Sequence, residues 1–213
     1  MKIDNQKQLN ITHNWFDSTY LLAGAPRQQE VYRLLSSAGL FDTLREYSPC
    51  LAGTIPLQVD IPESDADIIC EVNNHAAFEQ VIRESFGCHE GFTMKYSKVQ
   101  ERAVTLAQFV LCDEVSQALT VEIFGQSLPV EEQNAYRHLV VEARLLRLAH
   151  KEAHVQIRRL KSQGIKTEPA FAQYFGITGE PYQALLDLYD VEDDVLHKVI
   201  QNCQDKCQII HTL

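Results

Sequence analysis

The sequence is short of basic residues. Lysine and arginine together number 19, against 29 aspartates and glutamates, which gives a formal net charge of −10 over 213 residues. Proteins that coat duplex DNA or RNA bind mainly through basic contacts to phosphate, so this balance disfavours nucleic acid as a partner. A local basic cleft is still compatible with the composition.

Long hydrophobic runs are also missing. No stretch approaches the roughly 20 apolar residues that a membrane span needs, and residues 1–16 contain no uninterrupted apolar segment of the kind found in secretory signals. We therefore expect a cytoplasmic protein that does not bind membranes. The six cysteines are scattered through apolar segments, where free thiols behave as small hydrophobic side chains, so no disulfides are expected.

Low-complexity segments and a solenoid period are absent as well, and 45% hydrophobic residues suffice for a sizeable core. Apolar residues at helical spacing predict two short helices over residues 28–46. Between Leu51 and Gln126, five β-rich runs predict strands, and the stretch "HAAFEQVIRESFG" between them predicts one helix that ends at Gly87.

After residue 127 the pattern is almost purely helical. It begins with a long helix near Val130, whose apolar stripe contains Leu139 and Leu146. The sequence thus predicts an α/β lobe over residues 1–127 and a C-terminal helical lobe over residues 128–213.

Two acids stand at the start of a predicted strand. Alternate residues of a strand share a face, so Asp65, Asp67 and Ile69 point one way while Ala66 and Ile68 point toward the core. The two carboxylates then lie roughly 7 Å apart along the strand. Like charges this close repel unless a cation lies between them, and Mg²⁺ is the cation that such carboxylates bind beside substrate phosphates. The alternative is a solvated strand start in a turn.

A third acid and a glycine turn extend this pattern. Glu122 is a charge in the middle of an otherwise core-forming strand, where a lone carboxylate is costly to bury. If its strand lies beside the strand of Asp67, all three carboxylates face one pocket. Gly53 lets the backbone approach a ligand closely, and Thr54 adds a hydroxyl and an N–H group for a phosphate.

The order of these residues resembles a known signature. A Gly-Thr turn, ten residues, then Asp-Ala-Asp and a third acid on a later strand is similar to the nucleotidyltransferase signature of the DNA polymerase β superfamily. Over nearly its whole length the chain also resembles a bacterial family, domain-of-unknown-function family 4269. The segments that carry this likeness are "GTIPLQVDIPESDADIICEV", "VEIFGQSLPVEEQNAYRHLVVEARLL" and "LKSQGIKTEPAFAQYFGITGEPYQALL".

The resemblance implies an α+β fold, with a nucleotidyltransferase-like mixed β-sheet, flanking helices and a C-terminal helical lobe. It implies that Asp65, Asp67 and Glu122 hold Mg²⁺ or Mn²⁺ and act in catalysis, and that Gly53 and Thr54 bind the phosphates of a nucleoside triphosphate.

Arg137 and Arg144, seven residues apart, share a face of the long helix; they are candidates to bind the triphosphate, although a charged face is often merely solvated. Lys95, Lys98 and Arg102 are similar candidates. The expected function is transfer of a nucleoside monophosphate to a small-molecule or protein acceptor. The alternative is a catalytically inactive nucleotide-binding or interaction module, because Glu122 replaces the usual third Asp and residues 55–64 contain no arginine.

Overall fold

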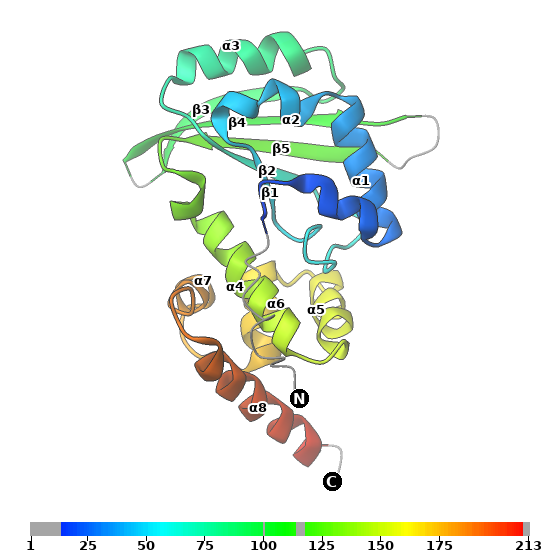
Figure 1. The fold of residues 1–213 in the computed structure, drawn as a ribbon, viewed down its shortest axis with the longest axis vertical. Helices are drawn as coiled ribbons and strands as arrows, with labels where there is room; N and C mark the ends of the chain where they lie inside the picture. Colours follow the sequence, from blue (N-terminus) through cyan, green and yellow to red (C-terminus); the bar gives the residue numbers. More distant parts are fainter. Residues whose placement is uncertain (1–13, 100, 114–117, 211–213) are drawn as a thin grey trace, which may run out of the picture.

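A mixed five-stranded sheet with the strand order β1-β2-β5-β4-β3 forms the centre of the molecule, and helices flank it (Figure 1). The computed structural model describes residues 14–99, 101–113 and 118–210, with 202–210 by backbone alone. The strands are β1 (Cys50–Ala52), β2 (Ala66–Glu71), β3 (Thr93–Val99), β4 (Arg102–Leu111) and β5 (Leu119–Gln126). The α-helices are α1 (Pro26–Ser37), α2 (Leu40–Thr43), α3 (His75–Phe86), α4 (Asn134–Leu148), α5 (Glu152–Ser162), α6 (Thr167–Phe175), α7 (Pro181–Leu186) and α8 (Asp193–Ile210), and three 3₁₀ turns cover Ser18–Ala23, Arg45–Tyr47 and Val130–Glu132.

Strands β2 and β5 form the parallel pair of this sheet, while β1–β2, β5–β4 and β4–β3 are antiparallel. A parallel pair needs a long crossover, and here α3, β3 and β4 supply it. Asn74 is the N-cap of helix α3, and its side chain accepts a hydrogen bond from the Ala77 N–H at 3.1 Å; Gly87 is the C-cap, as predicted. The crossover places residues far apart in sequence, such as Asp67 and Glu122, side by side.

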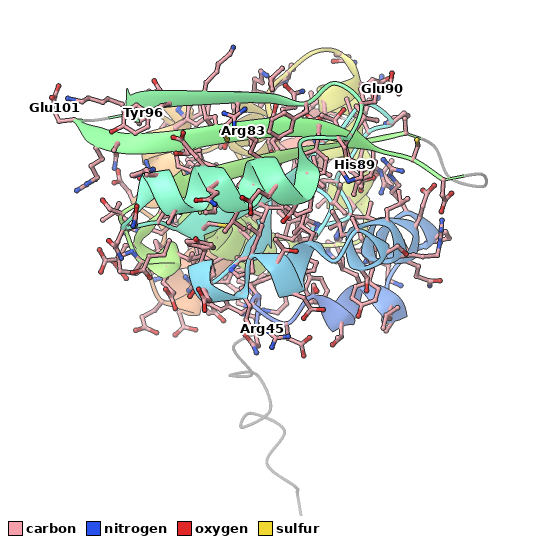
Figure 2. All side chains as sticks on the ribbon, turned by 90° about the horizontal axis from the view of Figure 1, so that it is seen from above. Arg45, Arg83, His89, Glu90, Tyr96 and Glu101 are labelled. Atoms are coloured by element: carbon pink, nitrogen blue, oxygen red, sulfur yellow. The ribbon has the colours of Figure 1, made fainter. Side chains whose placement is uncertain are left out.

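One face of the sheet packs against α1, α2 and α3. Ala66, Ile68 and Cys70 of β2 point into this core, together with Phe78 and Phe86 of α3, and all five are fully buried. Seen from above in Figure 2, α3 lies lengthwise across the sheet, with Arg83 on the helix and Glu90 in the loop beyond it. The alternation predicted for β2 is therefore correct, since its apolar set fills the core.

The opposite face of the sheet meets the C-terminal helices. Ile69 of β2 and Cys50 of β1 belong to the same buried cluster as Leu139, Leu145 and Phe171, which lie on α4 and α6. In Figure 1, α4 leads from the sheet down into α5–α8. The predicted fold class, a mixed sheet with flanking helices and a helical lobe after it, is confirmed. The boundary between 1–127 and 128–213 stays a prediction.

Helix α4 differs from its prediction in two details. It begins at Asn134, after a 3₁₀ turn that contains Val130, and its buried face includes His138 and Glu142 beside Leu139 and Leu146. The predicted apolar stripe lies at one side of this face. The reason is that α4 packs against β1, α7 and α8 at once, so more than one side of the helix is covered.

Two remaining expectations bear on membranes and cysteines. Within the described residues, no helix is both long and apolar enough to cross a membrane. Cys50 and Cys70 are buried free thiols, and Cys88 and Cys112 are exposed free thiols. The side chains of the other two cysteines, at 203 and 207, lie outside the described residues.

Candidate functional site

The three acids singled out in the sequence meet at one end of β2 and β5. Asp67 pairs in register with Glu122 on the parallel strand β5, and with Ala52 on β1 at its other side. Because neighbouring strands lie about 5 Å apart, the two carboxylates stand side by side on one face. Asp65 comes one residue before β2 and forms a side-chain hydrogen bond with Thr120.

The closeness of the acids changes their protonation. Burial raises the pKa of Asp67 to about 7, and the neighbouring charges of Glu122 and Asp65 contribute to this rise. Burial also raises the pKa of Glu122, again with a contribution from Asp65, while Lys166 opposes the rise. The pKa of Asp65 is raised by burial against the opposing effects of Thr120 and Lys166. The raised pKa brings the titration of Asp67 close to neutral pH.

Gly53 fits tightly beside Asp67. Its φ angle is +71°, and a Cβ atom built on it would lie 2.0 Å from Oδ2 of Asp67. A side chain at this position would therefore be strained and would displace the carboxylate. The next residue, Thr54, is 7% exposed, and its hydroxyl donates a hydrogen bond to Oγ of Ser64 at 3.3 Å. The turn at Gly53 and Thr54 thus places its backbone close to the carboxylate of Asp67.

A cavity of about 910 Å³ opens between the acidic end of the sheet and the C-terminal helices. Its lining includes five residues predicted for the site, namely Gly53, Thr54, Asp67, Glu122 and Arg137. Asp65 and Arg144 are not part of the lining. Asp65 acts on the cavity through its charge, as the raised pKa values of Asp67 and Glu122 indicate.

The two arginines of α4 have different surroundings. Arg137 lies over the ring of Tyr189, 4.6 Å from its centroid, and its Nη2 is 3.8 Å from Asp190. Arg144 instead donates hydrogen bonds to Asp193 at 2.9 and 3.1 Å and to the carbonyl of Tyr189 at 2.9 Å. Arg144 therefore fixes the segment between α7 and α8, and we leave it out of the proposed ligand site.

Several polar residues of the cavity wall escaped the sequence analysis. His138 and Glu142 of α4 and Glu168 of α6 line the cavity, and Lys161 of α5 interacts electrostatically with both glutamates. His138 and Glu142 are four residues apart, so they share a helix face with buried Leu145. A histidine and a glutamate four residues apart, among the apolar residues of a helix, could have been identified from the sequence as candidate site residues.

The donor set suits a hard divalent cation. Carboxylate oxygens are the protein ligands that Mg²⁺ prefers. Burial is the main cause of the raised pKa of Asp67, and a cation between Asp65, Asp67 and Glu122 would relieve the repulsion that adds to it. In the residues that the structure describes, no group of three His, Cys, Asp or Glu side chains is arranged to hold a metal ion. The acids therefore fit such a cation in chemistry, and a bound substrate would have to complete its coordination.

The family Domain of unknown function (DUF4269) matches residues 33–188, so the chain belongs to this family. This confirms the family to which the sequence pointed. No curated protein matches the chain at a significant level.

The fold is similar to several solved structures. The Cid1 poly(U) polymerase bound to MgATP aligns at 13% identity and a TM-score of 0.46, over 71% of this chain and 44% of that one. Cid1 with Mg 3′-dATP aligns at 12% identity and a TM-score of 0.48, over 79% and 52% of the chains. The GLD-2/RNP-8 complex aligns at 12% identity and a TM-score of 0.45, over 78% and 48%.

The chain thus spans about half the length of these similar structures. Cid1 is described as an RNA terminal uridylyl transferase, so this comparison gives no support to the expectation that nucleic acid is disfavoured as a partner.

Proposed function

We propose that this protein is a nucleotidyltransferase, which moves a nucleoside monophosphate from a nucleoside triphosphate to an acceptor in the presence of Mg²⁺ or Mn²⁺. The observation that carries the proposal is the pairing of Asp67 with Glu122 in register, beside the Gly53 turn, on the wall of one cavity. Acids placed this way repel each other in the empty protein and gain from a bound cation.

Each residue of this group has a part in the proposed reaction. Asp65, Asp67 and Glu122 would hold the cation, which when bound neutralises phosphate charge and polarises the phosphoryl group. The backbone of Gly53 and Thr54 would bind the phosphates, because the missing side chain at Gly53 lets a ligand come close. Arg137, which lies over the ring of Tyr189 and lines the cavity, would face the triphosphate or the base.

The transfer itself exchanges one phosphorus–oxygen bond for another. An acceptor hydroxyl oxygen bonds to the α-phosphorus, the bond from this phosphorus to the bridging oxygen breaks, and pyrophosphate leaves with that electron pair. The proton of the hydroxyl passes to a carboxylate of the cavity, and Glu122 suits this role because its side chain is exposed to the cavity. We propose a small molecule or a protein as the acceptor, in a cytoplasmic setting.

A thermal-shift series tests the proposal. Mg²⁺ with each of the four ribonucleoside triphosphates should raise the melting temperature of the wild type for at least one nucleotide, and not that of the Asp65→Asn, Asp67→Asn double variant. Glu71→Gln is the matched control, since Glu71 lies on the same face of β2 but outside the cavity lining. Release of pyrophosphate then reports transfer.

The same measurement has a predicted pH dependence. Because the Asp67 carboxyl has a pKa of about 7 in the metal-free protein, Mg²⁺ must displace its proton at pH 6 but much less so at pH 8. The nucleotide-dependent shift should therefore grow between pH 6 and pH 8. An equal shift in the wild type and the double variant at both pH values would contradict the proposed site.

The arrangement of the acids also favours a second candidate, a nucleotide-binding module without transfer activity. The observation behind it is that the described carboxylates do not form a ready group of three metal ligands. This candidate predicts the same thermal shift with Mg²⁺ and nucleotide, but no release of pyrophosphate with any acceptor.

A further inference from the structure

The cavity contains a buried glutamate that the proposed transfer does not use. Glu142 of α4 is 2% exposed, and its Oε1 atom has no hydrogen-bond partner. Its side chain also forms part of the cavity lining. A carboxylate in such a place is costly unless a donor meets it, and burial accordingly raises its pKa well above the usual range. The Oε1 atom of Glu142 is therefore a buried oxygen that a ligand could bond.

The charge around Glu142 is negative overall. Glu168 of α6 and Asp67 of β2 line the same cavity, and the charge of Glu168 acts on both Glu142 and Asp67. Among the described residues, Lys161 is the cation that acts on Glu142, and it also acts on Asp67, Glu168 and Asp60. One ammonium group thus acts on four carboxyl groups, and within the described part of the chain it forms no close ion pair with any of them. Arg27 and Arg158 also act on Asp60, and His138 also pairs with Glu168.

His138 offers no free donor to Glu142, because both of its ring nitrogens face other acceptors. Its Nε2 lies 3.0 Å from the carbonyl oxygen of Tyr182, and its Nδ1 lies 3.4 Å from Oε1 of Glu168. A carbonyl oxygen can only accept, so Nε2 carries a proton and is committed to Tyr182. Neither ring nitrogen is paired with Glu142. The Oε1 atom of Glu142 therefore remains able to bond a ligand.

From these observations we propose that Glu142 and Glu168 form a recognition site for an organic ammonium group, carried by the acceptor of the transfer reaction. An ammonium supplies up to three donors and a positive charge, which are what the orphan Oε1 of Glu142 and the excess of carboxyl groups lack. The acceptor would then be a small molecule with both an ammonium and a hydroxyl group.

An ammonium suits this wall better than a metal ion does. In the described part of the chain, no three His, Cys, Asp or Glu side chains are placed to hold a metal, and the Nε2 atom of His138 is committed to a carbonyl. Apolar and aromatic side chains share the lining, among them Phe124, Leu139 and Tyr189, and these would contact the carbon skeleton of an organic ligand. The cavity volume of about 910 Å³ lies near the top of the roughly 300–1,000 Å³ range of small-molecule sites, which leaves room beside a nucleotide.

The assignment of the ammonium to the acceptor rests on the proposed function, whereas the ammonium site itself does not. Its test therefore uses binding rather than turnover. Spermidine is the probe, because it presents several ammonium groups on a flexible chain, and calorimetric titration at a physiological salt concentration measures its affinity for the full chain without metal or nucleotide.

The variants separate the site from the general acidity of the protein. Glu142→Gln removes the carboxylate at nearly constant shape and should weaken spermidine binding about tenfold or more. Glu90→Gln makes the same substitution in the loop beyond α3 (Figure 2), outside the cavity lining, and should bind like the wild type. Glu142→Met, of similar length, is the second variant in case the first fails to fold.

The outcomes are distinct. The proposal is overturned if spermidine does not bind the wild type, or if it binds the wild type, Glu142→Gln and Glu90→Gln equally. Mg²⁺ with nucleotide should still raise the melting temperature of Glu142→Gln, because this residue is not among the proposed metal ligands. If spermidine binds through Glu142 but no nucleotide binds, the ammonium site stands and the proposed transfer fails.

Discussion

The two faces of the central sheet differ in what they bury. The face under α1, α2 and α3 is filled by apolar side chains such as Ile68, Phe78 and Phe109, all fully buried. The face toward the C-terminal helices buries apolar residues too, but it also carries Asp67 and a cavity with carboxyl groups on its walls. Successive residues of one strand, Asp67 and Ile68, thus belong to different environments.

This difference teaches where the stability and the chemistry of the molecule reside. A packed apolar face gains free energy from burial and loses it when atoms are removed. On the other face, the fold holds like charges close together, which lowers the stability of the protein. Groups perturbed in this way cluster at functional sites. Removing apolar atoms from one face and removing a carboxylate charge from the other should therefore have opposite effects on stability.

The largest effect is expected on the apolar face. Phe78→Ala removes a fully buried ring whose centroid is 4.6 Å from that of Tyr47, and it should lower the free energy of unfolding by about 3–5 kcal/mol. Denaturant titration measures this. The comparison of the two faces would fail if Phe78→Ala cost no more than a substitution of an exposed residue such as Tyr96, which is 59% exposed (Figure 2).

Comparing substitutions at two glycines tests the close contact between Gly53 and Asp67 at the acidic end of the sheet. Gly53→Ala and Gly164→Ala both place a side chain at positive φ, +71° and +87°, so both should lose about 1 kcal/mol or more of stability. Only Gly53→Ala also meets Asp67, at 2.0 Å, whereas a Cβ at Gly164 meets nothing within 4 Å.

Gly53→Ala should therefore cost about 2–4 kcal/mol in total and abolish the nucleotide-dependent thermal shift. Gly164→Ala should keep that shift. Equal loss of stability and of nucleotide binding in both variants would show that the contact with Asp67 has no role.

Substitutions of the two arginines of α4 should show different effects, on stability for Arg144 and on nucleotide binding for Arg137. Arg144→Met removes charge-assisted hydrogen bonds to Asp193 and to backbone carbonyls, and it should lower the free energy of unfolding by about 1–3 kcal/mol. Arg137→Met breaks a 3.8 Å pair with the exposed Asp190, which should cost less than about 1 kcal/mol. Only Arg137→Met should weaken nucleotide binding; the reverse pattern would exclude Arg137 from the site.

The smallest expected effect has the opposite sign. Burial raises the pKa of Glu142, so the folded protein keeps a proton that the unfolded chain releases above a pH of about 4.3. The stability contributed by this residue consequently falls as the pH rises from that value toward the raised pKa. Glu142→Gln should match the wild type near pH 4.5 and be the more stable of the two at pH 8.

Urea titrations at both pH values measure this effect, with Glu90→Gln as the control that should show no such dependence. A Glu142→Gln variant that is less stable than the wild type at pH 8 would mean that the carboxylate has a stabilising partner.

Local pattern made part of this protein readable from its sequence. The alternation in β2 and the glycine at the end of α3 indicated these elements, because strand period and helix caps depend on neighbouring residues alone. The motif of Gly53, Asp65 and Asp67 was readable for the same reason. The family likeness extended this local information to a mixed sheet with flanking helices and a C-terminal helical lobe.

Only the tertiary structure decided which distant residues meet. The register that places Glu122 beside Asp67 depends on a parallel pairing across a long crossover, and no local pattern fixes such a register. The sequence also does not distinguish the two arginines of α4, which are seven residues apart on one helix. In the structure, Arg137 lines the cavity, whereas Arg144 donates a hydrogen bond to the segment before α8. The buried face of α4, with Glu142 on it, was set by contacts with β1, α7 and α8 together, because burial is a property of everything packed around a side chain and not of its own helix.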